Sequence, residues 1–310
     1  MPEIIRVIEI GGKGIRKADV INGEIKSVFI PYEPITTVRD LLYFATFDLC
    51  TDTMAIAYSS AGVINSHRWV VTSPNAHFLD KADLATITEK TTGRIPTVVL
   101  NDMEASVTGM HVLFPQLKYF IGITWSSGIG LRVYADGVGI ISDSEGGHMC
   151  VDASPFARLC GCGRRGCIEA IAGGINVTCQ ILTELQARGL EAPPPGMHPC
   201  KYLDEAYLAN NDWAMDLYHQ ITTGMGVFLA NLVTLLRPTA IVWKGSFAQS
   251  ALRISPIEEA IRATMYTHLM QQSWADELKF LFVPSPPELI EDGEAYLGAA
   301  EFAKLFLKQL

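Results

Sequence analysis

Two segments that lie far apart in the sequence repeat the same order of short elements. The first copy has the order strand, glycine-rich turn, strand, Asn-Gly turn and strand: residues 4–10, 11–14, 15–21, 22–23 and 24–31. The second copy keeps this order, with Asp-Gly at the second turn: residues 119–125, 126–130, 131–135, 136–137 and 138–141. Asn-Gly and Asp-Gly between apolar runs are strong hairpin signals. The repeat therefore predicts two similar domains, each opening with a three-stranded antiparallel meander.

Helices and strands alternate after each meander. In the first half, the pattern predicts helices and strands over residues 36–50, 54–58, 79–92 and 97–100. In the second half, it predicts them over residues 212–236, 240–243, 257–270 and 278–283. A meander followed by strand–helix units is typical of a mixed sheet flanked by helices. We therefore expect an α/β fold in two domains around a central cleft, with residues 1–116 plus 294–310 in one and residues 117–293 in the other.

The composition supports two folded domains and excludes several classes of protein. Of the 310 residues, 49% are hydrophobic and 18% are charged, which suits two cores and excludes intrinsic disorder. The net charge of −9 argues against a nucleic-acid partner, because such binding needs Lys and Arg to neutralise phosphates. No signal peptide or membrane span is predicted, since Asn231, Arg237 and Pro238 interrupt the longest apolar tract. We expect a cytoplasmic protein.

The glycine-rich turns of the two meanders are candidates for phosphate binding. Glycine has no Cβ atom, so its backbone N–H can approach an anionic oxygen closely. A glycine in a single hairpin is usually only a turn residue. Two turns at matching positions of a repeat, in residues 11–14 and 126–130, predict instead a clamp on a polyphosphate.

Four of the seven cysteines fall between Cys150 and Cys167. Cys160, Cys162 and Cys167 form a C-x-C-x₄-C pattern with glycines between them, and His148 lies upstream. Three thiolates and one imidazole are typical ligands of a closed structural zinc site. The alternative, that these cysteines are small buried hydrophobic residues, is not favoured by the glycine spacing. Cys150 is a second candidate for the fourth ligand, and the spacing alone does not separate it from His148.

The order of these motifs resembles the ROK family of repressors and sugar kinases. The resemblance rests on the two glycine-rich turns, on Asn101-Asp102, on Glu-x-Gly-His at residues 145–148, and on Cys-x-Cys-Gly-x-x-Gly-Cys-x-Glu at residues 160–169. It implies the duplicated actin-like ATPase (ribonuclease H-like) fold and an enzyme that phosphorylates a hexose with ATP. Family repressors carry an additional N-terminal DNA-binding domain. We therefore expect a kinase, glucokinase-like or N-acetylhexosamine-kinase-like, that forms homodimers or homotetramers.

The resemblance assigns residues to the sugar on the first half of the chain. Asp102 corresponds to the catalytic base, which accepts the proton of the attacking hydroxyl, the 6-hydroxyl by family analogy. Asn101 would hydrogen-bond neighbouring hydroxyls, and Gly62 corresponds to backbone that lines the sugar. Taken alone, Asn101-Asp102 is equally well explained as the N-cap of a helix over residues 103–113, and both roles can hold.

The resemblance also assigns sugar ligands on the second half. Glu145, His148 and Glu169 match family residues that bind vicinal hydroxyl groups. His148 would then bind zinc through one ring nitrogen and the sugar through the other. Order at the metal would therefore be coupled to substrate binding.

The nucleotide side departs from the family pattern. The candidate ligands of the phosphates and nucleotide, with Mg²⁺ carried by ATP, are Gly11, Gly12, Lys13, Ser127, Gly128, Gly245 and Ser246. Where the family has Asp-x-Gly-Gly-Thr, this chain has Glu9 and Lys13, so the carboxylate is one methylene longer and a cation replaces a hydroxyl. These departures leave two other hypotheses open: a non-catalytic sugar-binding regulator with a degenerate nucleotide site, and a zinc-stabilised scaffold.

Overall fold

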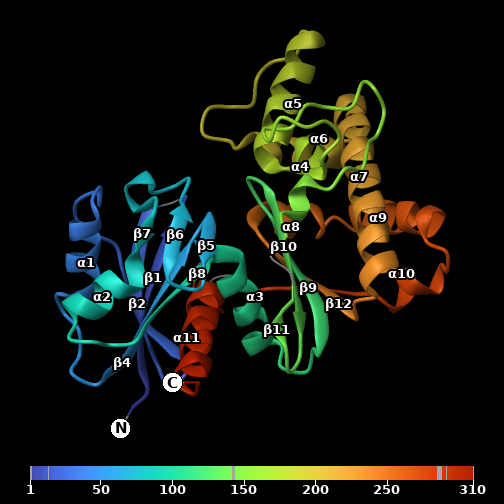
Figure 1. Cartoon of the computed structure of the whole chain (residues 1–310). Coiled ribbons are helices and arrows are strands. Elements are labelled where there is room, and N and C mark those ends of the chain that lie inside the picture. The colour runs from blue at the N-terminus through green and yellow to red at the C-terminus, as the bar shows by residue number, and fades with distance from the viewer. Residues whose placement is uncertain (1, 13, 142–143, 285–287, 291, 310) are drawn as a thin grey trace. The chain divides into compact units, whose positions relative to one another are not determined.

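The computed structural model describes residues 2–12, 14–141, 144–284, 288–290 and 292–309, and the chain divides into two compact units (Figure 1). The first unit comprises Met1–Lys118, Tyr134–Ile141 and Val283–Leu310. The second comprises Tyr119–Val133 and Ser142–Phe282. The domains expected from the sequence have their limits after residues 116 and 293, and these limits stay a prediction.

The first unit is built on a mixed five-stranded sheet with the order β3-β2-β1-β4-β8. Its meander consists of three antiparallel strands: β1 (Ile4–Gly11), β2 (Gly14–Ile21) and β3 (Glu24–Phe29). Asn22 and Gly23 have φ of +51° and +82°, as the two central residues of a type I′ turn require. β4 (Thr53–Ser60) and β8 (Thr97–Asn101) continue the sheet parallel to β1, so the carboxyl ends of these three strands share one edge.

Helices cover both faces of this sheet, because successive side chains of a strand point to opposite faces. The helices of the unit are α1 (Val38–Thr46), α2 (Leu84–Thr91), α3 (Asp102–Leu113) and α11 (Gly293–Leu307). Ile5 and Val7 of β1 lie in one core with residues of α3 and α11. Ile8 and Ile10 lie in a separate core with residues of α1 and α2. The face that a β1 side chain occupies therefore decides which helices it contacts.

A small second sheet follows β4 in the first unit. It comprises β5 (Val63–Asn65), β6 (Trp69–Thr72) and β7 (Ala82–Asp83), with the 3₁₀ turn η1 (His77–Leu79) between the last two. The helix predicted over residues 79–92 is therefore shorter and begins at Leu84. Asp83 sets this start, because its side chain accepts a hydrogen bond from the Thr86 N–H at 3.0 Å and caps the helix.

The second meander belongs to another five-stranded sheet, with the order β11-β10-β9-β12-β13. Its strands are β9 (Tyr119–Trp125), β10 (Ile129–Ala135), β11 (Gly139–Ile140), β12 (Ala240–Lys244) and β13 (Lys279–Phe282). β12 runs parallel to both β9 and β13. Both sheets thus place two parallel strands beside the first strand of a meander, and the predicted duplication is confirmed.

Helices of the second unit surround one large apolar core. They are α4 (Ile168–Ala172), α5 (Gly174–Ala187), α6 (Pro199–Leu208), α7 (Asp212–Leu236), α8 (Ser246–Ala251), α9 (Ser255–His268) and α10 (Ser273–Glu277), and the 3₁₀ turn η2 (Gly146–His148) precedes them. α7 ends just before Pro238, and Arg237 adopts a left-handed φ of +50° there. None of the described helices has both the length and the hydrophobicity to cross a membrane.

Helices α3 and α11 of the first unit pack with their backbones in direct contact. A Cβ atom at Gly109 would lie 1.7 Å from the carbonyl oxygen of Glu294. A Cβ atom at Gly298 would lie 1.9 Å from the carbonyl oxygen of Ala105. Any larger residue at either site must push the helices apart. The contact therefore fixes α3, which begins at Asp102, against α11.

We expect Gly298→Ala to lower the free energy of unfolding by about 1–3 kcal/mol, as overpacking of a close-packed site does. Gly224→Ala in α7 is the matched control, because the nearest atoms that a Cβ there would meet are side-chain atoms of Ile171 and Ile168, the first at 3.1 Å. Those side chains can move, and alanine favours a helix by about 1 kcal/mol over glycine. Denaturant unfolding of both variants checks this, and equal effects would contradict it.

Candidate active site and metal centre

The start of α3 is held by Asn101, the last residue of β8. Its side-chain oxygen accepts from the Met103 N–H at 3.0 Å, and its amide nitrogen donates to the Gly62 carbonyl at 3.0 Å. Asn101 is thus the N-cap of α3, and Asp102 is the first residue of the helix. The half-buried Asp102 carboxylate also accepts from the Met103 N–H, at 2.9 Å. The structure therefore brings Gly62, Asn101 and Asp102 together in the first unit.

Gly62 occupies a position that only glycine fits. Its φ is +112°, and a Cβ atom there would lie 2.1 Å from the Thr72 carbonyl oxygen. The Ser60 and Ser73 hydroxyls are 3.2 Å apart beside it, and both side chains are buried. The segment that carries the Gly62 carbonyl is therefore pressed against the end of β6, where it serves as a fixed acceptor for Asn101.

Glu104, in the first turn of α3, forms a histidine–carboxylate pair with His67. The sequence analysis did not predict this pair. His67 Nε2 is 3.0 Å from Glu104 Oε1, and the His67 ring packs on Phe302 with ring centroids 4.7 Å apart. The hydrogen bond with Glu104 raises the pKa of His67 above its ordinary value, although burial opposes this. His67 lies on a short loop before β6, and no local pattern connects it to residue 104.

The raised pKa of His67 predicts a pH-dependent stability. The charged pair stabilises the fold fully below the unfolded pKa of about 6.5, and this contribution is lost as the pH rises through the folded pKa. We expect His67→Asn to lower Tm more at pH 6 than at pH 8. Asn is chosen because it tolerates the positive φ of +53° at this residue.

Thermal unfolding between pH 5.5 and pH 8.5 measures this difference. His77→Asn is the control, because the His77 side chain is 80% exposed beside Asp80 and such pairs contribute little. A His67→Asn penalty that does not change with pH would show that the pair is not ionised in the folded protein.

The first glycine-rich turn connects β1 to β2. β1 ends at Gly11 and β2 begins at Gly14, and a Cβ atom at Gly12 would lie 3.9 Å from the side-chain oxygen of Asn75. The turn therefore lies beside the segment that follows β6. Lys13, predicted as a phosphate ligand, lies outside the described residues.

The second glycine-rich turn and the Gly245 segment meet at the carboxyl ends of β9 and β12. Gly245 has a φ of +108°, and a Cβ atom there would lie 2.4 Å from the Trp125 carbonyl oxygen. The Ser127 carbonyl accepts from the Ile175 N–H at 2.9 Å, at the start of α5. Gly245 and Ser246, at the start of α8, thus lie against the turn that carries Ser127 and Gly128, and their common role in nucleotide binding stays a prediction.

Glu169 lies in the first turn of helix α4, beside the second glycine-rich turn, which carries Gly128. Its Oε2 atom accepts from the Ile129 N–H at 3.2 Å. A Cβ atom at Gly128 would lie 2.7 Å from that oxygen, and one at Gly147 would lie 3.3 Å from it. The other carboxylate oxygen is 4.0 Å from His148 Nδ1. The structure therefore joins Glu169, Gly128 and His148 in the second unit, and Glu145 is exposed just before η2.

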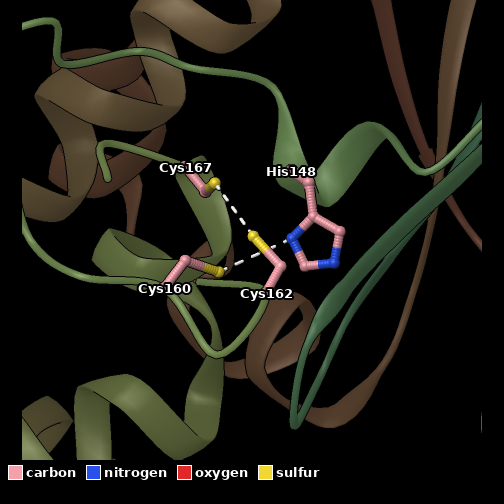
Figure 2. A group of neighbouring side chains, drawn as sticks. All are labelled: His148, Cys160, Cys162 and Cys167. Carbon is pink, nitrogen blue, oxygen red and sulfur yellow. Dashed lines mark hydrogen bonds between the residues drawn. The ribbon is translucent and has the colours of Figure 1, made fainter. Parts of the chain in front are cut away.

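His148, Cys160, Cys162 and Cys167 gather their ligand atoms into one cluster. All four atoms lie within 4.8 Å of one another. Cys160 Sγ is 3.5 Å from His148 Nδ1, and Cys162 Sγ is 3.7 Å from Cys167 Sγ. Figure 2 shows the three sulfur atoms and Nδ1 of the imidazole pointing toward one another. Cys150 is not part of the cluster, because its sulfur donates to the Asp152 carbonyl at 3.4 Å.

Two of the separations within the cluster match those of a tetrahedral zinc site. Zn–S bonds of about 2.3 Å and Zn–N bonds of about 2.0 Å place two sulfur ligands about 3.8 Å apart and a sulfur and a nitrogen about 3.5 Å apart. The observed 3.7 Å and 3.5 Å agree with these separations. Three soft thiolates and one imidazole are also the donor set that selects zinc over magnesium or calcium.

The thiols of the cluster differ in their readiness to ionise. The Arg164 backbone N–H donates to Cys162 and lowers the pKa of that thiol to about 6. Burial raises the pKa of Cys167 to about 12, and the neighbouring sulfur atoms add to this effect. Cys162 therefore supplies a thiolate at neutral pH, whereas a bound cation has to displace the proton of Cys167.

The sequence profile of the ROK family matches residues 8–305, which is nearly the whole chain. This chain is a member of the ROK family. The resemblance inferred from the glycine, Asn-Asp and cysteine motifs is thereby confirmed.

Relatives of this ROK chain include proteins named as sugar kinases. N-acetylmannosamine kinase of Haemophilus influenzae strain 86-028NP is 29% identical over 274 residues, which cover 82% of this chain and 84% of the relative. N-acetylmannosamine kinase of Citrobacter koseri is 33% identical over 147 residues, 45% of this chain and 49% of the relative. The first alignment therefore extends over both units.

Solved structures confirm the fold predicted for this ROK chain. A ROK hexokinase from Thermus thermophilus superposes with a TM-score of 0.78 at 23% identity, over 99% of this chain and 100% of the other. A ROK glucokinase from Streptomyces griseus, in complex with glucose and AMPPNP, gives a TM-score of 0.70 at 23% identity, over 97% and 99% of the two chains. The fold class, a duplicated actin-like ATPase, is confirmed.

The candidate residues of this ROK chain fall into two sets. Those in the first unit are Gly11, Gly12, Gly62, Asn101 and Asp102. Those in the second unit are Ser127, Gly128, Glu145, His148, Glu169, Gly245, Ser246 and the three cysteines. The first-unit set follows the carboxyl ends of β1, β4 and β8, and Ser127, Gly128, Gly245 and Ser246 follow those of β9 and β12, the edge where ligands of open α/β sheets bind.

Proposed function

We propose that this chain phosphorylates the 6-hydroxyl of a hexose with ATP, that N-acetylmannosamine is the first candidate substrate, and that Asp102 is the general base. The coarser class follows from the family and its relatives: the chain is a carbohydrate kinase. The observation that carries the finer proposal is the start of α3. There the Asn101 side chain caps the helix and donates to the Gly62 carbonyl, and the half-buried Asp102 carboxylate follows in the next residue.

The proposed step is an in-line phosphoryl transfer. The Asp102 carboxylate accepts the hydroxyl proton as the sugar oxygen forms a bond to the γ-phosphorus, and the bond from the γ-phosphorus to the bridging oxygen breaks to release ADP. Mg²⁺ would arrive with ATP and neutralise charge on the phosphates. Gly11, Gly12, Gly128 and the Gly245 segment would offer backbone N–H groups to them.

The second unit would supply ligands for the sugar hydroxyls. Glu169 keeps one carboxylate oxygen on the Ile129 N–H, and its other oxygen lies near His148. Nδ1 of His148 faces the cysteine sulfurs, so Nε2 would be the ring nitrogen for the sugar. His148, Cys160, Cys162 and Cys167 would hold zinc in a closed site, with four protein ligands and no open position for a reacting group.

An ADP-release assay across a panel of sugars tests this proposal. N-acetylmannosamine, N-acetylglucosamine, glucose and mannose are each supplied with Mg-ATP, with the matching 6-deoxy sugar as the control for the attacking hydroxyl. We expect ADP with at least one N-acetylated sugar and none with its 6-deoxy analogue. Sugar-dependent thermal stabilisation without ADP from any sugar would instead identify a sugar-binding regulator. Sedimentation of the same sample would test the proposed homodimer or homotetramer.

A further inference from the structure

A buried charged network lies beneath the first glycine-rich turn. Glu9 and Arg16 are directly opposite each other on β1 and β2, and Arg16 Nη2 is 2.6 Å from Glu9 Oε2. The same nitrogen is 2.7 Å from Asp292 Oδ2, at the residue before α11. These three side chains are only 11–17% exposed. Arg16 therefore joins the β1–β2 hairpin to the start of α11.

Tyr296 adds a second connection from α11 to the same carboxylate. The completely buried Tyr296 donates its hydroxyl to Glu9 Oε2 at 3.3 Å. Asp292 is the N-cap residue of α11 and Tyr296 lies in the first turn of that helix, where its N–H donates to the Asp292 carbonyl at 3.4 Å. Burial, with the nearby Glu9 charge, raises the pKa of Tyr296, and the hydroxyl stays protonated as a donor.

The Glu9 carboxylate is also in contact with the turn itself. A Cβ atom at Gly11 would lie 3.0 Å from Glu9 Oε1. One oxygen of Glu9 thus faces the backbone of Gly11, and the other is held by Arg16 and Tyr296. Burial works against the charge of Arg16, but Glu9 and Asp292 outweigh it and raise its pKa, so Arg16 remains a cation. The position of this carboxylate therefore limits the space beside Gly11.

We propose that Arg16, Asp292 and Tyr296 are positioning residues for the backbone of Gly11 and Gly12, and that they order it by holding the Glu9 carboxylate against Gly11. This inference rests on the proposed function, since the turn contacts phosphate only if the chain uses ATP. Binding to a pre-ordered turn costs less conformational entropy than binding to a loose one. Loosening the network therefore weakens nucleotide binding and leaves the sugar side, at Asn101 and Gly62, unchanged.

Tyr296→Phe tests the proposal, with Tyr58→Phe as the matched control. Tyr58 is also completely buried in the first unit, but its hydroxyl lies 3.1 Å from Thr88, in the core against α1 and α2. For Tyr296→Phe we expect the KM for ATP to rise by about 2–10-fold, the effect of one lost hydrogen bond, with the sugar KM unchanged. Tyr58→Phe is expected to change neither constant.

Two Arg16 variants extend the series. Arg16→Met is expected to raise the KM for ATP by more than tenfold, because two buried carboxylates lose their cation. Arg16→Lys keeps the charge but not the planar guanidinium, so its effect should lie between those of wild type and Arg16→Met. If Arg16→Met does not fold, Arg16→Lys and Tyr296→Phe still test the proposal through their KM for ATP. A KM for ATP of Arg16→Lys equal to that of wild type overturns the proposal.

Calorimetric titration with Mg-AMPPNP separates this inference from the proposed function. If wild type binds AMPPNP but makes no ADP, the kinase proposal fails, and the positioning role is judged by the Kd of Tyr296→Phe. A raised Kd supports that role. A Kd equal to that of wild type, or equally raised in Tyr58→Phe, overturns it. Absence of any AMPPNP binding by wild type overturns both.

Discussion

Asp102→Asn should lower kcat for sugar phosphorylation by about 10²–10⁴-fold, the usual contribution of a general base. Asparagine keeps the size of the side chain and an oxygen that can accept from the Met103 N–H, as Asp102 does at 2.9 Å. It removes only the capacity to take up the hydroxyl proton. Because that capacity is used in the transition state, kcat and kcat/KM should fall by similar factors.

Glu104→Gln is the matched control for Asp102→Asn. Both residues are carboxylates in the first turn of α3, so both variants lose a similar interaction with the helix dipole, about 0.3–1 kcal/mol. Glu104 contacts His67, and we expect its variant to retain kcat within about threefold, since it lacks a proton-transfer role. Equal losses in the two variants, or a loss below tenfold for Asp102→Asn, would rule out Asp102 as the base.

The parts of the fold that the sequence predicts best have strong local signals. The strand over residues 119–125 and the helix over residues 212–236 have the bounds of β9 and α7. β9 is bounded by a serine- and glycine-containing turn, and α7 is a long apolar segment stopped by Pro238. The small sheet of β5, β6 and β7 has no comparable signal, because its strands have two to four residues and many of their side chains are exposed.

In the candidate site, too, the sequence predicts the residues that are close together in the chain and misses the pairs that are far apart. The metal ligands are close in sequence, at most 19 positions apart, so the spacing predicts the three cysteine ligands and leaves His148 and Cys150 as candidates for the fourth. The fourth ligand depends on loop geometry, which directs Cys150 to the Asp152 carbonyl instead. The His67–Glu104 pair and the Tyr296–Glu9 contact join residues 37 and 287 positions apart. Such pairs depend on the packing of α3 and α11 on the sheet, which no local pattern encodes.

Cys162→Ser should abolish stoichiometric zinc binding and lower Tm. We expect about one zinc per wild-type chain and a small fraction of that in the variant, because serine is a poor zinc ligand beside thiolates. Structural zinc contributes directly to folding, and a loss of about 3 kcal/mol would lower Tm by about 6–12 °C for a cooperative unit of about 150–250 residues. Elemental analysis and thermal unfolding measure the two effects.

Cys150→Ser is the matched control for the metal site. Cys150 lies in the same segment and is exposed, but its sulfur is not among the four clustered ligand atoms. This variant should keep its zinc and its Tm. If Cys150→Ser lost zinc as fully as Cys162→Ser, the ligand set would be wrong, and a wild-type protein without metal would refute the site itself.

Zinc removal should also affect the two substrates unequally. His148 Nδ1 is 3.5 Å from Cys160 Sγ and 4.0 Å from Glu169 Oε1, so an ion held by the cluster would fix the imidazole beside the proposed sugar ligand. Among the nucleotide candidates, Gly11 is in contact with Glu9 and Gly245 packs on Trp125, whereas Gly128 is linked to His148 only through Glu169. Chelation or Cys162→Ser should therefore raise the KM for the sugar by about tenfold, the lower end of the 10–100-fold range seen when a binding residue loses the partner that orients it. The KM for ATP should stay within about twofold of the wild-type value. Equal changes in the two constants would indicate that the metal stabilises the second unit as a whole and does not orient His148 toward the sugar.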